Sequence, residues 1–509
     1  MALASFFDKT ALAALQVLQG LDRAGLEERL AASPVALAFD KHAAESPEGC
    51  AALDLALRLL ARLYPSVALY ALDEAAAAKR EELASLALRI NPDIDLRPAA
   101  PAVATLVVGR TPIVHQGEVY YIGSAGWSAR FSPESPVGSS ASENPFGAGA
   151  AACLGAANIF RAVFRDALPG GSADRPLDWC LLDMRVRFQG DEGYGADPSS
   201  ELGDLDLEET ILVGLGAVGH GALWALGRLR SVVGHLHVVD DEAIEVSNLQ
   251  RYVLALQDDV GTNKADLAER IVEQGSLTCE PHVGAWRSFL AARANWQMRR
   301  VAVAVDSASE RIAVQASLPE RIFNAWTQVE NLGVSRHADF LNGPCLACLY
   351  MPRGVKLSES EEISGALLMP EREVRDMLYH NTPLSREWIG AIAAAHGRPA
   401  EELQPFEGES IRAFYSKAVC GGILLTSDDQ RGSPETPMAF QSALAGVLLA
   451  SEIVIDVGRR PAPVSNTIQV DLRRPLSAFV SPTIPRSQDV FCLCRDEDLL
   501  ESYSTKYRA

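Results

Sequence analysis

Three glycines near the middle of the chain have a spacing that suggests phosphate chemistry. Gly214, Gly216 and Gly219 form G-x-G-x-x-G in "ILVGLGAVGHG", directly after a segment of strand length and at the start of a helical segment. Such glycines allow a tight turn and let a phosphate approach the backbone at a helix N-terminus. Asp240 ends the next predicted strand, where a carboxylate can bind ribose hydroxyls. The pattern predicts a nucleotide site and leaves NAD and ATP both open.

Polar residues after the second strand favour ATP. Asn248, Arg251 and Lys264 supply an amide and two cations, and Asp306 ends the later strand "VAVAVD". Two cations that face a helix N-terminus form a clamp for a polyphosphate, and a carboxylate at the end of a strand can hold Mg²⁺. A dinucleotide needs less positive charge than a triphosphate that loses pyrophosphate. Taken alone, Arg251 and Lys264 fit surface residues of a loop equally well.

Longer stretches add a resemblance to a known family. The sequence closely resembles the ThiF/MoeB and ubiquitin-activating-enzyme family over most of residues 205–350 and again over 438–509, in "GLGAVGHGALWALGRLRSVVGHLHVVDDEAIEVSNLQRYVLALQDDVGTNKADLAERI", "AVDSASER" and "NGPCLACLY". Members of this family bind Mg-ATP and adenylate the C-terminal carboxylate of a ubiquitin-fold protein.

The resemblance assigns roles to the residues of the nucleotide site. It implies that Asp240 holds the ribose and that Asp306 assists Mg²⁺. It also implies that Asn248, Arg251 and Lys264 contact the phosphates and the reacting carboxylate. Two points depart from the family: Glu242 stands where many members have Asp, and no arginine finger is identified, Arg110 and Arg130 being only candidates.

Four cysteines in two close pairs suggest a zinc site. Cys345 and Cys348 lie in "CLAC", and Cys492 and Cys494 lie in "FCLC". If the fold brings the pairs together, four thiolates form a tetrahedral site for Zn²⁺. The second pair is closer than the usual C-x-x-C, and buried or redox-active thiols are the alternative. The resemblance likewise implies a structural zinc ion between such pairs.

Cys420 is the candidate nucleophile. It lies in "YSKAVCGGILL", where two glycines allow an exposed turn and Lys417 can lower the thiol pKa. A single cysteine is more often an inert core residue. In the ubiquitin-activating branch of the family, however, a cysteine in an inserted domain accepts the activated carboxyl group as a thioester. The remaining cysteines are predicted to be structural, and the nine histidines show no ligand spacing.

Alternating apolar runs and helical segments predict an α/β protein with two Rossmann-like halves. The first half has strands at 34–39, 66–72 and 104–109 and no glycine-rich turn. Two helices of small residues, near 150 and 447, must pack closely. By the resemblance, an inactive and an active adenylation domain form a pseudo-dimer with a helical cysteine domain inserted. The predicted boundaries are 1–190 for the inactive domain, 191–207 for a linker, 208–350 and 437–509 for the active domain, and 351–436 for the insertion.

Composition limits the classes of partner. The formal net charge is −20, which argues against binding nucleic acid or an anionic membrane. We expect that no apolar stretch is as long as the ~18 residues that span a bilayer. We expect the first 30 residues to form an amphipathic helix. These features predict a cytoplasmic protein and a monomeric pseudo-dimer.

The predicted function is ATP-dependent activation of a ubiquitin-like protein, with a thioester on Cys420 and transfer to a conjugating-type enzyme. The chain most resembles the activating enzymes of bacterial ubiquitin-like conjugation operons, especially those of the Bil antiphage system. Three alternatives remain at this point: a sulfur-carrier adenylyltransferase of the ThiF/MoeB kind without a cysteine relay, an NAD-dependent oxidoreductase, and a scaffold without catalysis.

Overall fold

The computed structural model describes residues 4–168, 170–196, 202–351, 358–397, 399–415, 436–458, 465–477 and 483–507. Contacts divide the chain into two compact units. Unit 1 contains Met1–Thr10, Val17–Met351 and Pro437–Ala509, and unit 2 contains Ala11–Gln16 and Pro352–Thr436. Cys420 lies outside the described residues.

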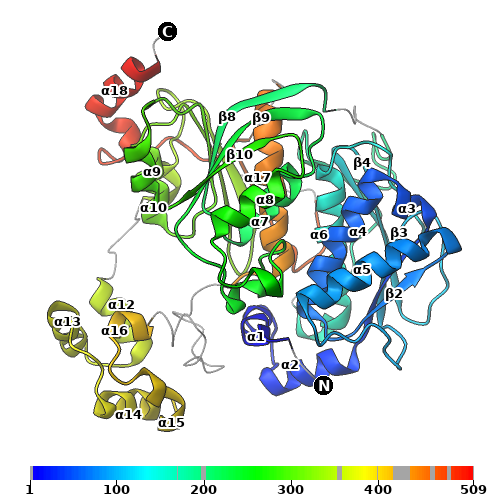
Figure 1. Cartoon of the computed structure of the whole chain (residues 1–509), viewed down its shortest axis with the longest axis horizontal. Helices are drawn as coiled ribbons and strands as arrows, with labels where there is room; N and C mark the ends of the chain where they lie inside the picture. Colours follow the sequence, from blue (N-terminus) through cyan, green and yellow to red (C-terminus); the bar gives the residue numbers. More distant parts are fainter. Residues whose placement is uncertain are drawn as a thin grey trace. The chain divides into compact units, whose positions relative to one another are not determined.

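The first half of unit 1 is built on a seven-stranded mixed sheet (Figure 1). Its order is β2-β1-β3-β4-β5-β6-β7, parallel from β2 to β4 and antiparallel from there on. The first three predicted strands are present and apolar because helices cover them. The bounds are β1 Val35–Phe39, β2 Val67–Ala71, β3 Ala104–Val108, β4 Glu118–Ala125, β5 Ser128–Ser132, β6 Leu177–Cys180 and β7 Arg185–Phe188.

The second half of unit 1 has its own seven-stranded sheet, in the order β10-β9-β8-β11-β12-β13-β14. The neighbours from β10 to β12 are parallel, and β13 and β14 add antiparallel pairs. β8 begins at Leu205, so the predicted linker ends earlier than residue 207. The bounds are β8 Leu205–Val213, β9 Val232–Asp240, β10 Thr278–Val283, β11 Arg300–Val303, β12 Arg321–Thr327, β13 Leu332–His337 and β14 Thr467–Val470.

Helices cover the faces of both sheets of unit 1. In the first half they are α2 Arg23–Ala32, α3 Lys41–Glu45, α4 Pro47–Leu63, α5 Ala77–Ile90 and α6 Phe146–Val163. Helix α1, Phe7–Leu15, begins in unit 1 and ends in the Ala11–Gln16 segment of unit 2. In the second half they are α7 Ala217–Leu226, α8 Lys264–Val272, α9 Trp286–Ala292, α10 Ala308–Ala316, α11 Ala347–Tyr350, α17 Ala439–Val457 and α18 Glu497–Tyr507.

The two sheets share one connectivity. Strands β1 to β6 of the first sheet correspond in order and direction to β8, β9, β11, β12, β13 and β14 of the second. Helix α4 follows β1 as α7 follows β8, and α6 precedes β6 as α17 precedes β14. The second sheet adds β10 at its edge, and the first adds β7. The halves therefore repeat a topology, although only the second has the glycine pattern.

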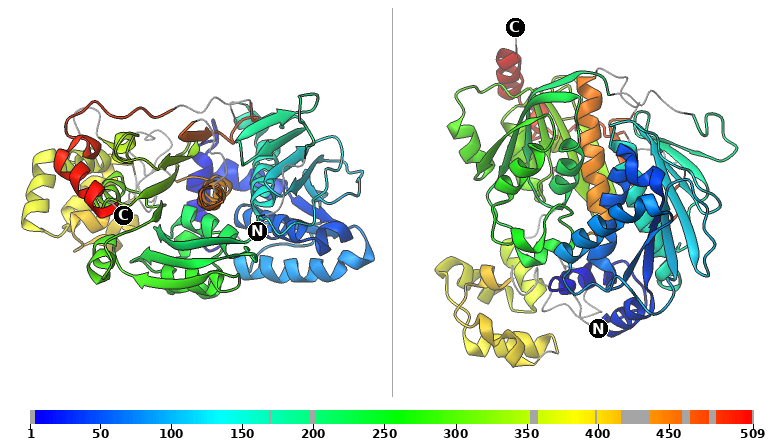
Figure 2. Two further views of the ribbon diagram at one scale, coloured as in Figure 1. Left: turned by 90° about the horizontal axis from the view of Figure 1, so that it is seen from above. Right: turned by 45° about the vertical axis from the view of Figure 1, so that its right-hand side comes forward.

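The two helices rich in small residues pack in the middle of unit 1, as predicted (Figure 2). A methyl group on Gly446 of α17 would collide with the carbonyl oxygen of Val218 in α7, and one on Gly221 would come within 2.6 Å of the carbonyl oxygen of Ala443. Between α6 and α17, the rings of Phe160 and Phe440 lie 5.7 Å apart. Backbone-to-backbone contact thus requires glycine where α7 meets α17.

By length and composition, α6 and α17 could each span a membrane. This corrects the expectation that no apolar stretch reaches that length. In the fold, however, 94% of the 18-residue apolar stretch of α6 is buried, and 89% of the corresponding stretch of α17 is buried. Their hydrophobicity is explained by packing against α4, α7 and the sheets.

The described part of unit 2 is mainly helical and has its own hydrophobic core. Its helices are α12 Glu359–Leu367, α13 Glu371–His380, α14 Arg386–Ala395, α15 Ala400–Leu403 and α16 Ile411–Phe414. They bury apolar residues at helical spacing, among them Val374 and Met377 of α13 and Ile389 and Ile392 of α14. Ser358 and Glu361 form a capping box at the start of α12.

Replacing Gly446 by alanine tests the contact between α7 and α17. Alanine usually favours a helix over glycine by roughly 0.5–1 kcal/mol, but here its methyl group meets backbone. We expect Gly446→Ala to lower the free energy of unfolding by about 1–3 kcal/mol, measured by thermal unfolding. Gly390→Ala in α14, where nothing lies within 4 Å of the added methyl group, is the matched control and should be neutral or stabilising. Equal behaviour of the two variants would contradict the packing argument.

Candidate functional site

The glycine loop lies where the carboxyl ends of β8, β9 and β11 meet. Gly214 has a φ of +89°, and a side chain there would come within 2.7 Å of the backbone nitrogen of Val305. A methyl group on Gly219 would strike the carbonyl oxygen of Gly214. Around Gly216 the nearest such atom is the Tyr252 hydroxyl, at 3.6 Å. The loop is thus tight at both ends and open at Gly216, where α7 begins and an anion can bind.

Asp240 fixes the glycine loop to β9. Its carboxylate accepts hydrogen bonds from the backbone nitrogens of Leu215 at 2.7 Å and Glu242 at 3.0 Å. The side chain is only 9% exposed, and this burial raises its pKa, while Lys264 acts in the opposite direction. In nucleotide-binding α/β folds, a carboxylate at the end of the strand that follows the glycine loop commonly binds the ribose.

Lys264 is a buried cation at the start of α8. Its Nζ lies 3.7 Å from Asp240, forms an ion pair with Glu242, and lies 5.1 Å from the centre of the Tyr252 ring. Burial alone would lower its pKa, but Tyr252 and the two carboxylates outweigh burial and raise it. Lys264 is therefore charged, and in this structure carboxylates neutralise it.

Asn248 and Arg251 lie on one short turn, η3 (Val246–Gln250), and just after it. The Asn248 side chain accepts a hydrogen bond from the backbone nitrogen of Glu245 at 2.9 Å, so it also shapes the turn. The Arg251 guanidinium lies 5.8 Å from the Tyr252 ring centre. Within the described part of the chain, no carboxylate lies within 4 Å of that guanidinium. Its charge is available to an anionic ligand.

Asp306 is exposed beyond the end of β11, directly before Ser307, which caps α10. The buried Arg311 donates to the backbone carbonyls of Val305 and Ala325, the latter at 2.9 Å. Arg311 thus holds the segment that carries Asp306 against β12. The "AVDSASER" motif contains this arginine, but its structural role follows only from the contacts.

Two arginines of the first half brace the loop that carries Arg251. From α4, Arg62 donates to the carbonyl oxygens of Tyr252 at 2.9 Å and Ala255 at 2.7 Å. Arg58 donates to the carbonyl oxygen of Val253 at 2.9 Å. Sequence reasoning missed both, because nothing local to α4 shows what it packs against. The first half therefore supports the site of the second half directly.

The two arginines considered as arginine fingers make contacts inside the first half. Arg130 lies 3.7 Å from the Asp178 carboxylate. The backbone nitrogen of Arg110 donates to Asp40 at 2.7 Å, and its side chain lies beside Gly138. These contacts give neither residue a role at the glycine loop.

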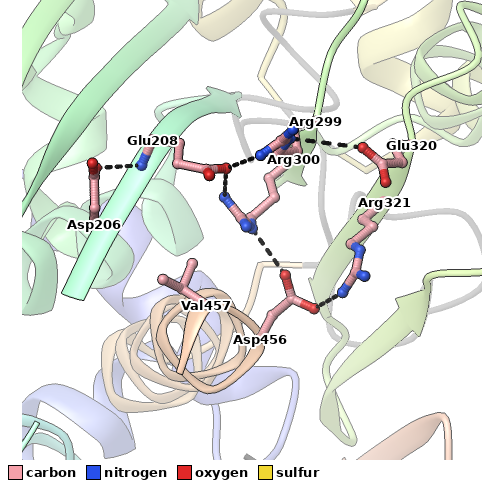
Figure 3. Close-up of a pocket in the computed structure, with 8 residues that line it drawn as sticks. All are labelled: Asp206, Glu208, Arg299, Arg300, Glu320, Arg321, Asp456 and Val457. Carbon is pink, nitrogen blue, oxygen red and sulfur yellow. Dashed lines mark hydrogen bonds and ion pairs between the residues drawn. The ribbon is translucent and has the colours of Figure 1, made fainter. Parts of the chain in front are cut away.

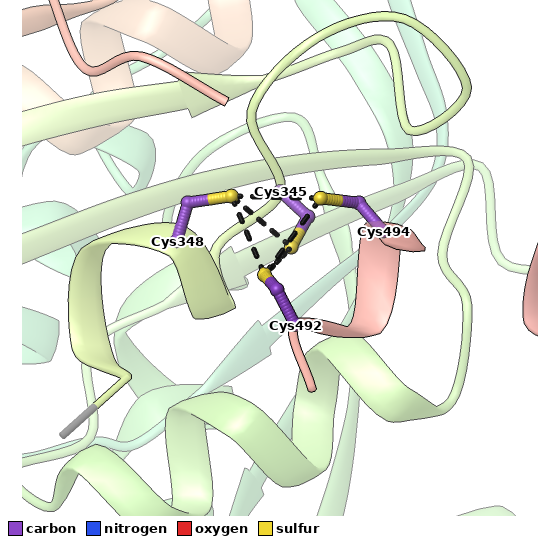
Figure 4. A group of neighbouring side chains, drawn as sticks. All are labelled: Cys345, Cys348, Cys492 and Cys494. Carbon is purple, nitrogen blue, oxygen red and sulfur yellow. Dashed lines mark hydrogen bonds between the residues drawn. The ribbon is translucent and has the colours of Figure 1, made fainter. Parts of the chain in front are cut away.

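The four paired cysteines converge in the second half, as Figure 4 shows. Their sulfur atoms are separated by 3.5–3.7 Å in five of the pairs, and all four cysteines are buried. A tetrahedron with Zn–S bonds of about 2.3 Å has edges of ~3.8 Å, so the donor set fits Zn²⁺. Hydrogen bonds with Cys348 and Cys494, together with burial, raise the pKa of the Cys345 thiol, so four thiolates need a cation among them.

The cysteine cluster joins the C-terminal segment to the second half. Cys492 and Cys494 precede α18, whose Tyr507 hydroxyl donates to the carbonyl oxygen of Leu318 at 2.9 Å. Phe340 and Tyr503 pack beside the sulfurs, with ring centres 5.1 Å apart. A metal ion in this closed, apolar site would be structural.

A polar pocket at the amino ends of the strands is lined by ion pairs (Figure 3). Arg299 pairs with Glu208 at 2.6 Å, and Arg300 pairs with Asp456 at 2.9 Å. Arg321 pairs with Asp456 as well. The pocket lies at the start of β8, β11 and β12, whereas ligands of open α/β sheets bind at the carboxyl ends. These charges stabilise the fold.

The remaining described cysteines lie apart from the glycine loop. Cys153 is fully buried, and burial raises the pKa of Cys279 to about 12. Cys50 is half-buried at the start of α4, and its Sγ donates to the carbonyl oxygen of Ala44 at 3.0 Å. Burial raises its pKa too.

Comparison with protein families identifies the second half. The ThiF family model matches residues 198–452, which is half of the chain. The chain belongs to the ThiF family. It is an E1-like adenylating enzyme, and enzymes of the ThiF family use ATP. The model of prokaryotic E2 family C matches residues 38–165 in the first half.

Sequence relatives of this ThiF-family chain match either its whole length or a short part of it. A Sinorhizobium fredii protein named "Uncharacterized protein y4jF" is 43% identical over 512 residues, covering 100% of this chain and 98% of that protein. The SAMP-activating enzyme E1 of Haloferax volcanii is 42% identical over 101 residues, or 19% of this chain and 34% of that enzyme. A crystal structure of E. coli MccB with AMPCPP covers 55% of this chain and 65% of that chain, at 14% identity and a TM-score of 0.34.

Adjacent aspartates allow a matched test of the nucleotide site. The Asp240 side chain is 9% exposed and accepts a hydrogen bond from the glycine loop, whereas Asp241 is exposed. A hydrogen bond to a charged group contributes about 1.5–3 kcal/mol. We therefore expect Asp240→Asn to weaken ATP binding by roughly 10- to 100-fold, measured by isothermal titration calorimetry. Asp241→Asn should bind ATP like wild type. A normal affinity for Asp240→Asn would remove Asp240 from the site.

Removing one sulfur tests the metal site. We expect Cys492→Ser to lower bound zinc well below one equivalent, measured by elemental analysis, and to lower the midpoint of thermal unfolding. The reason is that the serine hydroxyl is a far weaker ligand for zinc than a thiolate. Cys279→Ser, away from the cluster on β10, is the matched control and should keep its zinc. Zinc retained at one equivalent in Cys492→Ser would refute the four-cysteine site.

Proposed function

We propose that this chain activates the C-terminal carboxylate of a ubiquitin-like protein with ATP and then holds it as a thioester on Cys420. The observation that carries the proposal is the ThiF-family half, in which Gly216, Lys264 and Arg251 gather at one edge of the sheet. The thioester would pass to a conjugating-type enzyme. We place the chain in bacterial antiphage defence, as the BilD component of Bil operons.

The arrangement of the site supports adenylation chemistry. The carboxylate of the ubiquitin-like tail attacks the α-phosphate of ATP, forming a mixed anhydride and releasing pyrophosphate. Asp240 would bind the ribose, and the amides at the start of α7 would bind phosphate oxygens. Arg251 and Lys264 would neutralise the leaving pyrophosphate, and Asn248 would contact the reacting groups. Asp306 is placed to hold Mg²⁺, which stabilises charge on the phosphates when bound.

The first half would act as the inactive partner in a pseudo-dimer. Asp40 follows β1, where the glycine loop follows β8 in the second half. Its carboxylate accepts hydrogen bonds from the backbone nitrogens of Ala43 at 3.0 Å, Arg110 at 2.7 Å and Thr111 at 2.9 Å. Burial by itself would raise its pKa, but these N–H groups lower it. A fixed carboxylate thus places negative charge directly after β1, at the position that Gly214 takes after β8.

A second buried carboxylate closes the same end of the first half. Glu48, in the first turn of α4, accepts hydrogen bonds from Gly126 at 3.1 Å and from the hydroxyl groups of Ser124, Ser140 and Ser142. Together with Asp40 it places negative charge where ATP would place its own. This supports one ATP site per chain and a monomeric pseudo-dimer.

The relay to Cys420 rests on its place in the chain. In the sequence, Cys420 falls in the stretch 352–436, which is inserted between two segments of unit 1. Its thiolate would attack the acyl-adenylate, form a thioester and release AMP. The thioester keeps the carboxyl group activated in a form that water attacks less readily than the anhydride.

Partners follow from the same proposal. Sequence relatives include enzymes named for activating SAMP and Nedd8, which supports a ubiquitin-like partner. The match of residues 38–165 to prokaryotic E2 family C supports a link to conjugation. We place the protein in the cytoplasm, and its charge of −20 argues against nucleic-acid and membrane partners.

A sulfur-carrier adenylyltransferase is the second candidate. A relative from Porphyra purpurea, 34% identical over 79 residues, is named a probable molybdopterin-synthase adenylyltransferase. Such an enzyme would use the same ATP site and would not need Cys420. An NAD-dependent oxidoreductase is disfavoured, because the chain belongs to the ThiF family.

The relay is tested with the ubiquitin-like protein encoded beside this gene. Wild type, Cys420→Ala and Cys50→Ala are incubated with Mg-ATP and separated on a non-reducing gel. We expect a thiol-sensitive adduct in wild type and in Cys50→Ala, and none in Cys420→Ala, with pyrophosphate release in all three.

Other patterns reject the relay in distinct ways. An adduct lost only in Cys50→Ala would move the acceptor into the region that matches prokaryotic E2 family C. Pyrophosphate release without any adduct would favour the sulfur-carrier function. Absence of pyrophosphate release in wild type would refute adenylation of this partner.

A further inference from the structure

Three side chains on the outer strands of the second sheet bring ligand atoms together. His235 and His237 lie on one face of β9, and β10 pairs with it in parallel so that Glu280 lies beside His237. The Glu280 Oε2 atom is 3.1 Å from His235 Nε2 and 3.5 Å from His237 Nδ1. All three ligand atoms lie within 4.8 Å of one another.

The contacts of Thr278 favour a proton on Nδ1 of His235 over the other tautomer, in which Nε2 would donate to Glu280. The Thr278 hydroxyl donates its proton to the carbonyl oxygen of Gly234 at 3.1 Å. The same hydroxyl lies 2.9 Å from His235 Nδ1, so it accepts the Nδ1 proton. In the neutral imidazole, the lone pair of Nε2 then faces Glu280.

In His237 the proton lies on the other ring nitrogen, Nε2. Its Nε2 lies 3.2 Å from a carboxylate oxygen of Glu209 on β8, which accepts the Nε2 proton. Arg293 holds Glu209 in turn, at 2.9 Å. The lone pair of His237 Nδ1 therefore faces Glu280. A carboxylate that accepts from the far nitrogen of a histidine is the usual support of a metal-bound imidazole.

Three electron-pair donors thus converge with no hydrogen atom between them when both imidazoles are neutral. A cation relieves this repulsion. Bonds of about 2.0–2.2 Å from a tetrahedral metal to nitrogen and oxygen place neighbouring ligands ~3.3 Å apart. The separations of 3.1 and 3.5 Å bracket that value. Two imidazoles with one carboxylate suit Zn²⁺ and related ions, whereas Mg²⁺ and Ca²⁺ prefer oxygen ligands.

We propose that His235, His237 and Glu280 bind a divalent transition-metal ion of the Zn²⁺ class. The ligands are His235 Nε2, His237 Nδ1 and Glu280 Oε2, and the fourth position faces solvent. The side chains of His235 and Glu280 are 43% and 62% exposed, and that of His237 is 12% exposed. The site is separate from the four cysteines and from the proposed adenylation, and the metal would link edge strand β10 to β9.

The test uses the full chain with zinc already bound to its cysteines and loose metal removed. Zn²⁺ is titrated by isothermal titration calorimetry, and Co²⁺ is titrated in parallel by absorption spectroscopy. We expect one further equivalent of Zn²⁺, and visible d–d bands of Co²⁺ without a new thiolate-to-metal band. His235→Ala and His237→Ala should weaken binding by more than about 100-fold, beyond the ~10- to 100-fold typical of outer partners.

Two more variants separate ligands from neighbours. Glu280→Gln keeps shape at an exposed position and should weaken binding by at least about 10-fold. His282→Ala is the matched control, because His282 lies on β10 two residues from Glu280 but contacts Ser288 at 3.0 Å. It should bind like wild type.

Three results would overturn the site. They are the absence of a further equivalent in wild type, unchanged binding in both His235→Ala and His237→Ala, and an equal loss in His282→Ala. The last would indicate non-specific binding to surface imidazoles. Circular dichroism of every variant distinguishes a lost ligand from a lost fold.

Discussion

Backbone contact between α7 and α17 is the constraint on which the rest of unit 1 depends. Glycines at 221 and 446 let the two helices approach until carbonyl oxygens meet the opposing backbone. Gly149 of α6 extends this close packing, since a side chain there would come within 2.6 Å of the Trp224 ring. The N-terminus of α7 carries the glycine loop. The close packing around α7, within the second half and against α6 of the first, thus also fixes the direction in which the amides at the start of α7 point.

Charge at the glycine loop is balanced within the protein. Lys264 is buried and pairs with Asp240 and Glu242, so in the proposed adenylation a nucleotide would compete with these carboxylates for the cation. The two carboxylates differ in how firmly they are held. Asp240 is 9% exposed and bonded to two backbone nitrogens, whereas Glu242 is 70% exposed. Glu242 can therefore swing into water when phosphate arrives, at little energetic cost, while Asp240 stays in place. Arg58 and Arg62 hold the loop that carries Arg251 through hydrogen bonds to its backbone carbonyls. Among the described residues Arg251 has no carboxylate partner, so a phosphate would not have to displace one.

Features encoded by neighbouring residues were predictable, and features that need strand pairing or packing were not. The glycine loop and Asp240 follow from strand, turn and helix signals in one stretch. The C-x-x-C and C-x-C pairs predicted a cluster because cysteine chemistry leaves few alternatives. His235 and His237 passed unnoticed, since their third partner lies 43 residues beyond His237 and only the register of β9 and β10 brings it close. The hydrogen bonds from Arg58 and Arg62 to the loop after Arg251, and those that Asp40 accepts from Arg110 and Thr111, likewise join residues that are far apart in the sequence.

Both halves have the same connectivity, yet they differ at the residue that follows the first strand. In the second half this residue is Gly214, and there is open space around Gly216, where α7 begins. In the first half it is Asp40, whose carboxylate accepts hydrogen bonds from the backbone nitrogens of Ala43, Arg110 and Thr111. An aspartate that replaces a bound anion stabilises the turn without a ligand, which suits a half that serves as support. The glycine and the aspartate after the first strand thus fit the proposed division of labour, in which the second half binds the nucleotide and the first half supports it.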